Sequence, residues 1–342
     1  ETIAHINSVD VNAVGEVVVS ATKISALSAQ NTGKALAKGG SAFSGASTVM
    51  AISINMATNV VLTSATAEIR NAAVETDGAV SVLAESTGTI LADIATQTQA
   101  FGGGGGSYAI GVSLAFNSVG FKPQNFLYNT VDTFIGTTLT GTDKAQAAAR
   151  IVDSAVTAAN DISVDAVSDA SVHATITNSA VATSISLSES NSGVSIAPVI
   201  ALNRVASDAL AEITEGAVTS TGIRSTAGSV KVSATDSSEI LAHIKSSSVA
   251  VSAGTKSTLS VSIAATFARN EILSNATAQI VGVNTLSAAQ NVQVIAARTA
   301  TIDALGLSSS VALAASFGSS SAPSISGGGA VAVNRINGGV AA

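Results

Sequence analysis

The sequence predicts an all-β, tandem-repeat fold, a rod-like parallel β-solenoid resembling a β-helix. Three observations predict it. Three short sequence patterns recur five times in the same order along the 342 residues. Apolar and polar side chains alternate within these patterns, which is the periodicity of a β-strand. The composition is 46% hydrophobic but only 3% aromatic, so any core between the strands must be thin. An array of stacked antiparallel β-hairpins is the alternative architecture.

The first pattern, Ala-x-Ile, marks the start of each repeat. It predicts one continuous elongated array of five repeats, over residues 4–66, 67–148, 149–210, 211–277 and 278–341. A repeat of this size with small side chains cannot bury enough surface alone, so neighbouring repeats must stack. Because a sixth Ala-x-Ile would begin at Ala342, we expect the chain to be a segment of a longer protein.

The middle residue of Ala-x-Ile is polar in every copy, so this column of side chains is expected to face water. The second pattern, Val/Ile-x-Val-x-Ala, predicts a further strand in each repeat, at residues 17–21, 80–84, 162–166, 230–234 and 292–296. More alternating stretches follow on both sides of a Gly/Ser-rich break. Each repeat is therefore expected to hold several strands, and the solenoid to make several coils per repeat. A short helix is predicted only at residues 143–150, where Lys144, Ala145, Gln146 and three further alanines favour it.

The third pattern is Asn-x-Val/Ile, and it predicts a structural column of asparagines. Stacked amides at a turn of a solenoid can bond one another and the adjacent backbone. Five equivalent turn residues without such bonds are the other interpretation, and both make the asparagines architectural. The predicted column consists of Asn59, Asn117, Asn203, Asn270 and Asn334.

One repeat departs from the pattern. Ala-x-Ile begins eight residues after the Asn in three cases but thirty-two after Asn117, which indicates a 24-residue insertion at about residues 120–144. Aromatic side chains gather in it, and aromatic anchors are typical of interfaces. The candidate interface residues are Phe121, Phe126, Tyr128 and Phe134; packing of the inserted segment onto the rod is the alternative.

Composition and spacing argue against several classes of function. There is no Lys/Arg cluster to suggest nucleic-acid binding, no apolar run of transmembrane length and no Cys to form a disulfide or a thiolate metal site. The three histidines do not converge, and the closest acidic group, Asp161, Asp165 and Asp169, has the spacing of a solvated strand face. We therefore expect no catalytic residue, no metal, no cofactor and no enzyme activity.

The Ala/Ser/Thr/Val repeats with Gly-rich breaks and a final Asn-x-Val resemble the giant repetitive exoproteins of bacteria, the adhesin and haemagglutinin-like class. The resemblance implies a secreted protein, displayed on the cell surface as an adhesive rod or filament. Its partners are then expected to be neighbouring repeats, further copies joined end to end or laterally, or other cells and surface glycans. A carbohydrate- or cell-binding module acting through residues 120–144 is the alternative function.

Overall fold

The computed structural model describes residues 1–43, 45, 47–121, 144–215, 222–318 and 320–342. The described chain is all-β, and its strands form three parallel sheets, here called A, B and C. Sheet A contains β1 (Thr2–Asn7), β4 (Thr48–Val61), β5 (Ser64–Arg70), β8 (Gly106–Val119), β9 (Ala145–Val152), β12 (Asn191–Thr214), β15 (Thr258–Val281) and β18 (Ser324–Ala341). Sheet B contains β2 (Asp10–Ala13), β6 (Ala73–Thr76), β10 (Ala155–Ala158), β13 (Gly222–Ser225) and β16 (Thr285–Ala288). Sheet C contains β3 (Val17–Gly40), β7 (Val80–Gly103), β11 (Ile162–Ser186), β14 (Val230–Gly254) and β17 (Val292–Ser316).

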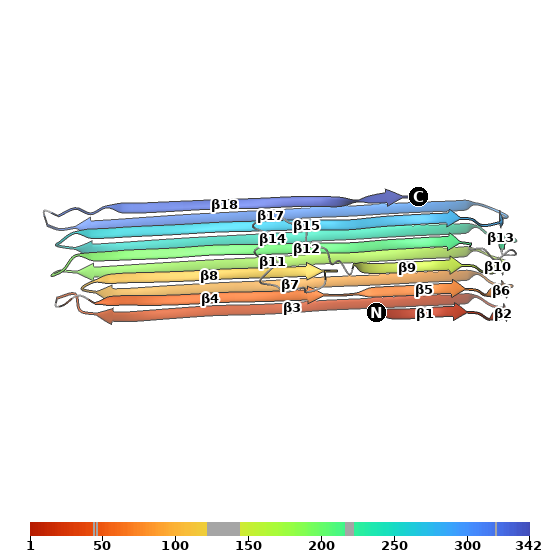
Figure 1. Cartoon of the computed structure of the whole chain (residues 1–342), viewed down its shortest axis with the longest axis horizontal. Helices are drawn as coiled ribbons and strands as arrows, with labels where there is room; N and C mark the ends of the chain where they lie inside the picture. Colours follow the sequence, from red (N-terminus) through yellow and green to blue (C-terminus); the bar gives the residue numbers. More distant parts are fainter. Residues whose placement is uncertain (44, 46, 122–143, 216–221, 319) are drawn as a thin grey trace.

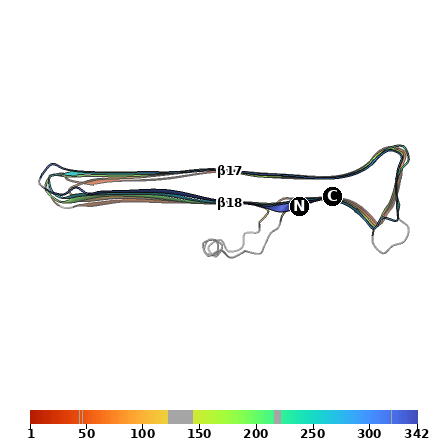
Figure 2. The same cartoon turned by 90° about the horizontal axis from the view of Figure 1, so that it is seen from above.

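The chain passes through the sheets in the order A, B, C and back to A, so the architecture is β-helix-like (Figures 1 and 2). Every strand pairs in parallel with its equivalent in the next turn, and the register joins equivalent residues, such as Ala4 with Ala67 and Ala211 with Ala278. One sequence repeat therefore makes one turn, and the expectation of several coils per repeat is wrong. The hairpin alternative is also wrong, because the strand pairs are parallel.

The turns are wide and flat. Strands β12 and β14 have 24 and 25 residues, so each spans about 80 Å at about 3.3 Å per residue. Five turns about 4.8 Å apart add up to only about 24 Å along the stack. The longest axis of this chain therefore runs along the strands, as Figure 1 shows. The stacking direction, which was expected to be the long axis of a rod, is shorter than the strands.

The interior differs between the two ends of each turn. Where sheet B closes the wider end (Figure 2), the core is formed by larger aliphatic side chains, including Ile69, Val82, Ile151, Val164 and Ile213. Along the narrow part, where sheets A and C face each other directly, one buried cluster is mostly alanine, and another combines alanine with Ile94, Ile176 and Ile244. The thin core expected from the composition is thus found in the narrow part only.

The corner from sheet A to sheet B requires a left-handed backbone. Asn71 and Asp153 have φ values of 49° and 50°, and Gly282 at the corner of a later turn has 74°. Asn, Asp and Gly are the residues that adopt this conformation at least cost, which explains three of these corners, while Ser8 has a φ of 55° at the corner of the first turn.

The helix predicted at residues 143–150 is wrong over the described residues, which begin at 144. Residues 145–152 form strand β9, which pairs with β5 on one side and β12 on the other. Alternate residues Ala145, Ala147, Ala149 and Ile151 enter the core. Burial of this face and two ladders of backbone hydrogen bonds outweigh the helix propensity of alanine, which amounts to only a few tenths of a kcal/mol per residue.

Candidate functional site

The five asparagines of the predicted column lie in one line through the interior of the stack. Each Nδ2 donates to the Oδ1 of the next turn: Asn59 to Asn117 at 2.7 Å, Asn117 to Asn203 at 2.8 Å, Asn203 to Asn270 at 2.9 Å and Asn270 to Asn334 at 2.8 Å. We call this line the asparagine ladder. It lies within strands β4, β8, β12, β15 and β18, not at a turn as the sequence suggested.

The ladder exists because the register is strictly parallel. Each carboxamide has a donor group and an acceptor oxygen, and the spacing between parallel strands brings the donor of one turn to the acceptor of the next. Asn203 and Asn270 are fully buried, so their amide bonds cannot be replaced by bonds to water. An unpaired amide there would cost about 1–3 kcal/mol. The ladder therefore favours the one register in which every asparagine meets an asparagine of the next turn.

A second line of polar groups joins sheets A and C across the narrow part. The hydroxyl of Ser248 donates to Ser195 at 2.8 Å, Ser262 to Ser248 at 3.0 Å, Ser310 to Ser262 at 2.9 Å and Ser326 to Ser310 at 2.9 Å. These five residues, the serine chain, alternate between the two sheets. Sequence reasoning missed the serine chain, although Ser and Ala at alternate positions of residues 195–201 and 246–250 were its signal.

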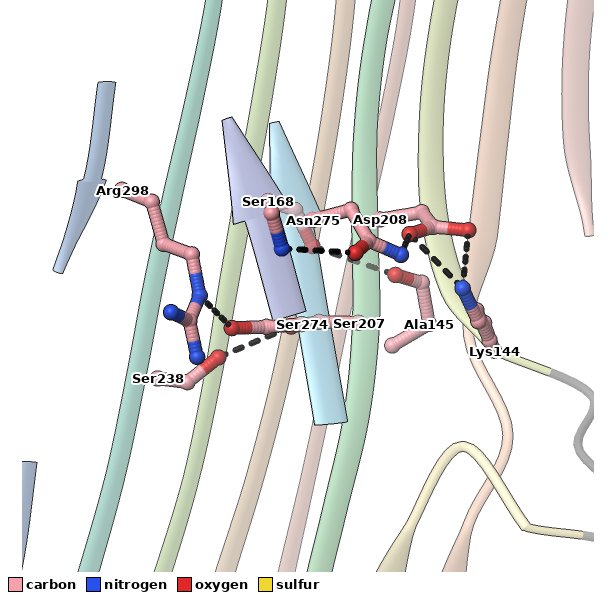
Figure 3. Close-up of polar contacts among 10 residues, drawn as sticks. Lys144, Ala145, Ser168, Ser207, Asp208, Ser238, Ser274, Asn275 and Arg298 are labelled. Carbon is pink, nitrogen blue, oxygen red and sulfur yellow. Dashed lines mark hydrogen bonds and ion pairs between the residues drawn. The ribbon is translucent and has the colours of Figure 1, made fainter. Parts of the chain in front are cut away.

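The third polar group lies between the aliphatic core and the narrow part, and we call it the waist cluster. Ser238 Oγ lies 2.8 Å from Ser207 Oγ, and Arg298 Nε donates to Ser274 Oγ at 2.6 Å (Figure 3). Ser238 Oγ also donates to Asp236 Oδ1 at 3.0 Å. Asp236 is fully buried. This burial raises the pKa of its carboxyl group above the ordinary value, while the surrounding hydroxyls and Arg298 act in the opposite direction.

On the outer side of sheet A, charged side chains of successive turns pair with one another. Lys144 Nζ contacts Asp208 at 2.8 Å, and Asp208 also accepts from Asn275 Nδ2 at 2.7 Å (Figure 3). Arg150 and Glu212 are 3.2 Å apart, in the outward Ala-x-Ile column. Such half-exposed pairs contribute about 0–1 kcal/mol each, so they add to the register without determining it.

Of the candidate interface residues in the insertion, the described part contains Phe121 alone; Phe126, Tyr128 and Phe134 lie outside it. Phe121 is 7% exposed, and the guanidinium of Arg204 lies 4.0 Å from its ring centroid. This arrangement is a cation–π contact that attaches the start of the insertion to β12. The Phe121 ring therefore packs against the chain.

The histidines are distributed over the outer surface. His5 and His243 are exposed, and His173 Nε2 lies 3.4 Å from a carboxylate oxygen of Glu239. Within the described ranges, no group of three or more His, Asp or Glu side chains is placed to hold a metal ion. The polar side chains that the fold brings together inside the stack are mainly Asn and Ser, with Asp236 at the waist cluster.

No helix long and apolar enough to cross a membrane is found among the described residues. Comparison of the chain with protein-family models, with curated proteins and with solved structures gave no match.

Proposed function

We propose that this chain is a structural segment of a parallel β-solenoid scaffold, displayed outside a bacterial cell and without enzymatic activity. One observation carries the proposal: the asparagine ladder and the backbone register continue without a change of partner through all five turns. Each turn thus offers the next turn the same set of backbone and amide hydrogen-bonding groups as the previous turn offers to it. An array of such turns can be lengthened by adding repeats, which is the property that a scaffold needs.

The resemblance to repetitive exoproteins supports the extracellular location. The solenoid gains stability from backbone and amide bonds between turns. The outer side of sheet C is rich in Ser and Thr, and only 11% of the chain is charged. Antibody labelling of intact producing cells tests the location directly. Labelling only after the cells are opened would contradict it.

A tandem fusion tests the scaffold itself. Joining residue 341 of one copy directly to residue 4 of a second copy places Ala4 eight residues after Asn334, the same spacing as from Asn203 to Ala211. The expected product is one continuous stack, about twice as high and equally wide, by electron microscopy or small-angle scattering. Two separate stacks on a tether would contradict the proposal.

A matched control is the same fusion with one extra residue at the junction. A shift of one residue reverses which side chains face the interior. The control is therefore expected to form two separate or disordered stacks. If both fusions gave the same continuous stack, equivalent residues would not determine the joining of turns.

A further inference from the structure

The outer side of sheet A along the narrow part is apolar. Its outward positions are alternate residues of 50–58 in β4, 108–116 in β8, 194–202 in β12, 261–269 in β15 and 325–333 in β18. We call these positions the apolar face. In β4 its members Met50, Ile52, Ile54 and Met56 are between 51% and 70% exposed. The sheet is therefore inverted here, with serine and asparagine inside and large aliphatic side chains outside.

The opposite outer surface of the same turns is polar in its central part. Outward residues of sheet C at this level include Thr175, Thr177 and Ser179 in β11, which pair with His243, Lys245 and Ser247 in β14. Asn178 between them reaches across the interior to the carbonyl oxygen of Pro198, which places the two outer surfaces back to back. In the fifth turn these columns end in Leu305 and Leu307, which are 47% and 48% exposed. The apolar character is thus concentrated on sheet A, where it occurs in every turn, so low charge in the chain as a whole does not account for it.

The apolar face is large enough for a stable interface. Five columns about 6.6 Å apart on five strands about 4.8 Å apart cover about 800 Å². A standard protein interface buries about 800 Å² on each partner, and the largest apolar patch on a typical monomer is about 300–600 Å². Arg269 is the one charged residue of the face, and Glu271 lies 3.6 Å from it.

The shape of the face also points to a sheet as its partner. Successive turns overlay one another almost along their whole length in Figure 2, so sheet A has little twist. Flat sheets of many strands are unusual and are typically stabilised by stacking against another sheet. Sheet C already stacks against the inner side of sheet A. The outer side of sheet A is equally flat, so its shape fits a second flat face.

In the central column of the face, side-chain size decreases from the first turn to the fifth. The column that begins at Ile54 continues as Val112, Pro198, Ala265 and Gly329. At Gly329, a Cβ atom would meet nothing within 4 Å, so this end of the column is open. A copy rotated by a two-fold axis along the strands places Ile54 over Gly329 and Val112 over Ala265, so large residues meet small ones.

We propose that the apolar face binds the same face of a second copy of this chain, with the first turn of one copy over the fifth turn of the other. The pair is isologous, since each contact occurs twice about the two-fold axis. It extends the proposed structural role by naming a lateral partner. Its test measures association between chains, whereas the tandem fusion measures stacking within one chain, so either proposal can fail alone.

Sedimentation of the full chain tests the association. Val194, in the middle turn of the face, lies over Val194 of the second copy, so Val194→Lys places two like charges opposite each other. Val181→Lys is the matched control, because Val181 is a half-buried outward valine of the same repeat on sheet C. The wild-type chain and Val181→Lys are expected to form dimers, and Val194→Lys is expected to lose the dimer with an unchanged far-UV spectrum.

Two mixing experiments test the geometry. A mixture of Val194→Lys and Val194→Glu is expected to regain the dimer, because opposite charges then meet. In the cysteine-free chain, Ile54→Cys mixed with Gly329→Cys is expected to be joined between copies by a short bismaleimide cross-linker, because stacked sheets lie about 10 Å apart, and Ile54→Cys alone is not. Cross-linking of Ile54→Cys with itself would overturn the proposed orientation.

Other outcomes overturn the interface. A monomeric wild-type chain would do so, as would equal dimerisation of Val194→Lys and Val181→Lys, which would assign association to the unpaired sheet edges instead. Flotation of a monomeric wild-type chain with neutral phosphatidylcholine vesicles, lost in Val194→Lys, would show that the face binds lipid and not a second copy.

Discussion

At the scale of single residues, the interior polar side chains determine how the turns are joined. Alanine and valine columns would pack almost equally well after a shift of two residues, because the same face stays buried. Asn203 allows no such shift, since its amide needs Asn117 on one side and Asn270 on the other. The asparagine ladder therefore fixes the register that the aliphatic core leaves open.

Asn203→Ala is expected to lower the free energy of unfolding by about 2–5 kcal/mol, because it leaves a donor on Asn117 and an acceptor on Asn270 unpaired and buried. Asn334→Ala is the matched variant at the exposed end of the same ladder, and its expected loss is about 1 kcal/mol or less. Denaturant unfolding measures both values. Equal losses at the two positions would show that the ladder does not act through buried amide bonds.

Asp236 gives the stability a defined pH dependence. Its pKa is higher in the folded chain than in the unfolded chain, so the folded chain binds more protons between the two values and stability falls as pH rises through that window. Asp236→Asn removes this loss. The variant is therefore expected to gain stability relative to the wild-type chain between about pH 3 and neutral pH.

Denaturant unfolding over that pH range measures the difference, and Asp169→Asn, which removes an exposed carboxylate from sheet C, controls for the change of net charge. A relative loss of stability in Asp236→Asn with rising pH would mean that Arg298 and the serine hydroxyls outweigh burial.

The sequence permits prediction of some of these residues and not of others. Asn203 and its equivalents stand at a fixed distance from Ala-x-Ile, so their common column is visible in the sequence. The serine chain was not predictable in the same way. In the sequence, Ser195 looks like a polar strand residue that faces water. Only the close approach of sheets A and C places its hydroxyl 2.8 Å from that of Ser248.

At the scale of elements, strand length is the feature that sequence reasoning misjudged. Strands usually have 3–10 residues, so the sequence of residues 230–254 suggests several short strands. In the structure β14 is one continuous strand over these residues. Several strands per repeat then suggest several coils per repeat. Strand β9 shows a related error, since three alanines look helical until β5 and β12 are seen on either side of it.

The insertion after β8 is expected to be dispensable for the fold. Deleting residues 121–144 joins Gly120 to Ala145, which align with Ala206 and Ser207 of the uninterrupted strand β12. The deletion loses the contacts of Phe121 and Lys144 but also removes the entropic cost of closing the insertion. The free energy of unfolding is therefore expected to change by no more than about 2 kcal/mol.

The control is a deletion of residues 121–143, one residue shorter. The extra residue reverses the faces of β9 or forces a bulge, so this variant is expected to be less stable than the first. Circular dichroism and denaturant unfolding compare the two. If both deletions unfold at the same denaturant concentration, β8 and β9 do not act as one interrupted strand.

At the scale of the whole molecule, the repeat and the turn coincide, so residues 58–86 positions apart in the sequence become neighbours at about 4.8 Å. This long-range pairing explains why the molecule is wide along the strands and short along the stack. It also gives the molecule two different outer surfaces, because most outward columns of sheet A along the narrow part stay apolar from turn to turn. The proposed scaffold and the proposed lateral pairing both depend on this single geometric fact.

Cross-linking of introduced cysteines tests that fact most directly, because the natural chain contains no cysteine. Thr177 and Lys245 are exposed register partners in β11 and β14, and the strand spacing of about 4.8 Å lies within the Cα separation that a disulfide spans. Thr177→Cys with Ser247→Cys is the control, since a shift of two residues separates the Cα atoms by about 8 Å. The first pair is expected to form an intramolecular disulfide on mild oxidation and the second is not. Equal cross-linking of both pairs, or of the second pair only, would contradict one in-register turn per repeat.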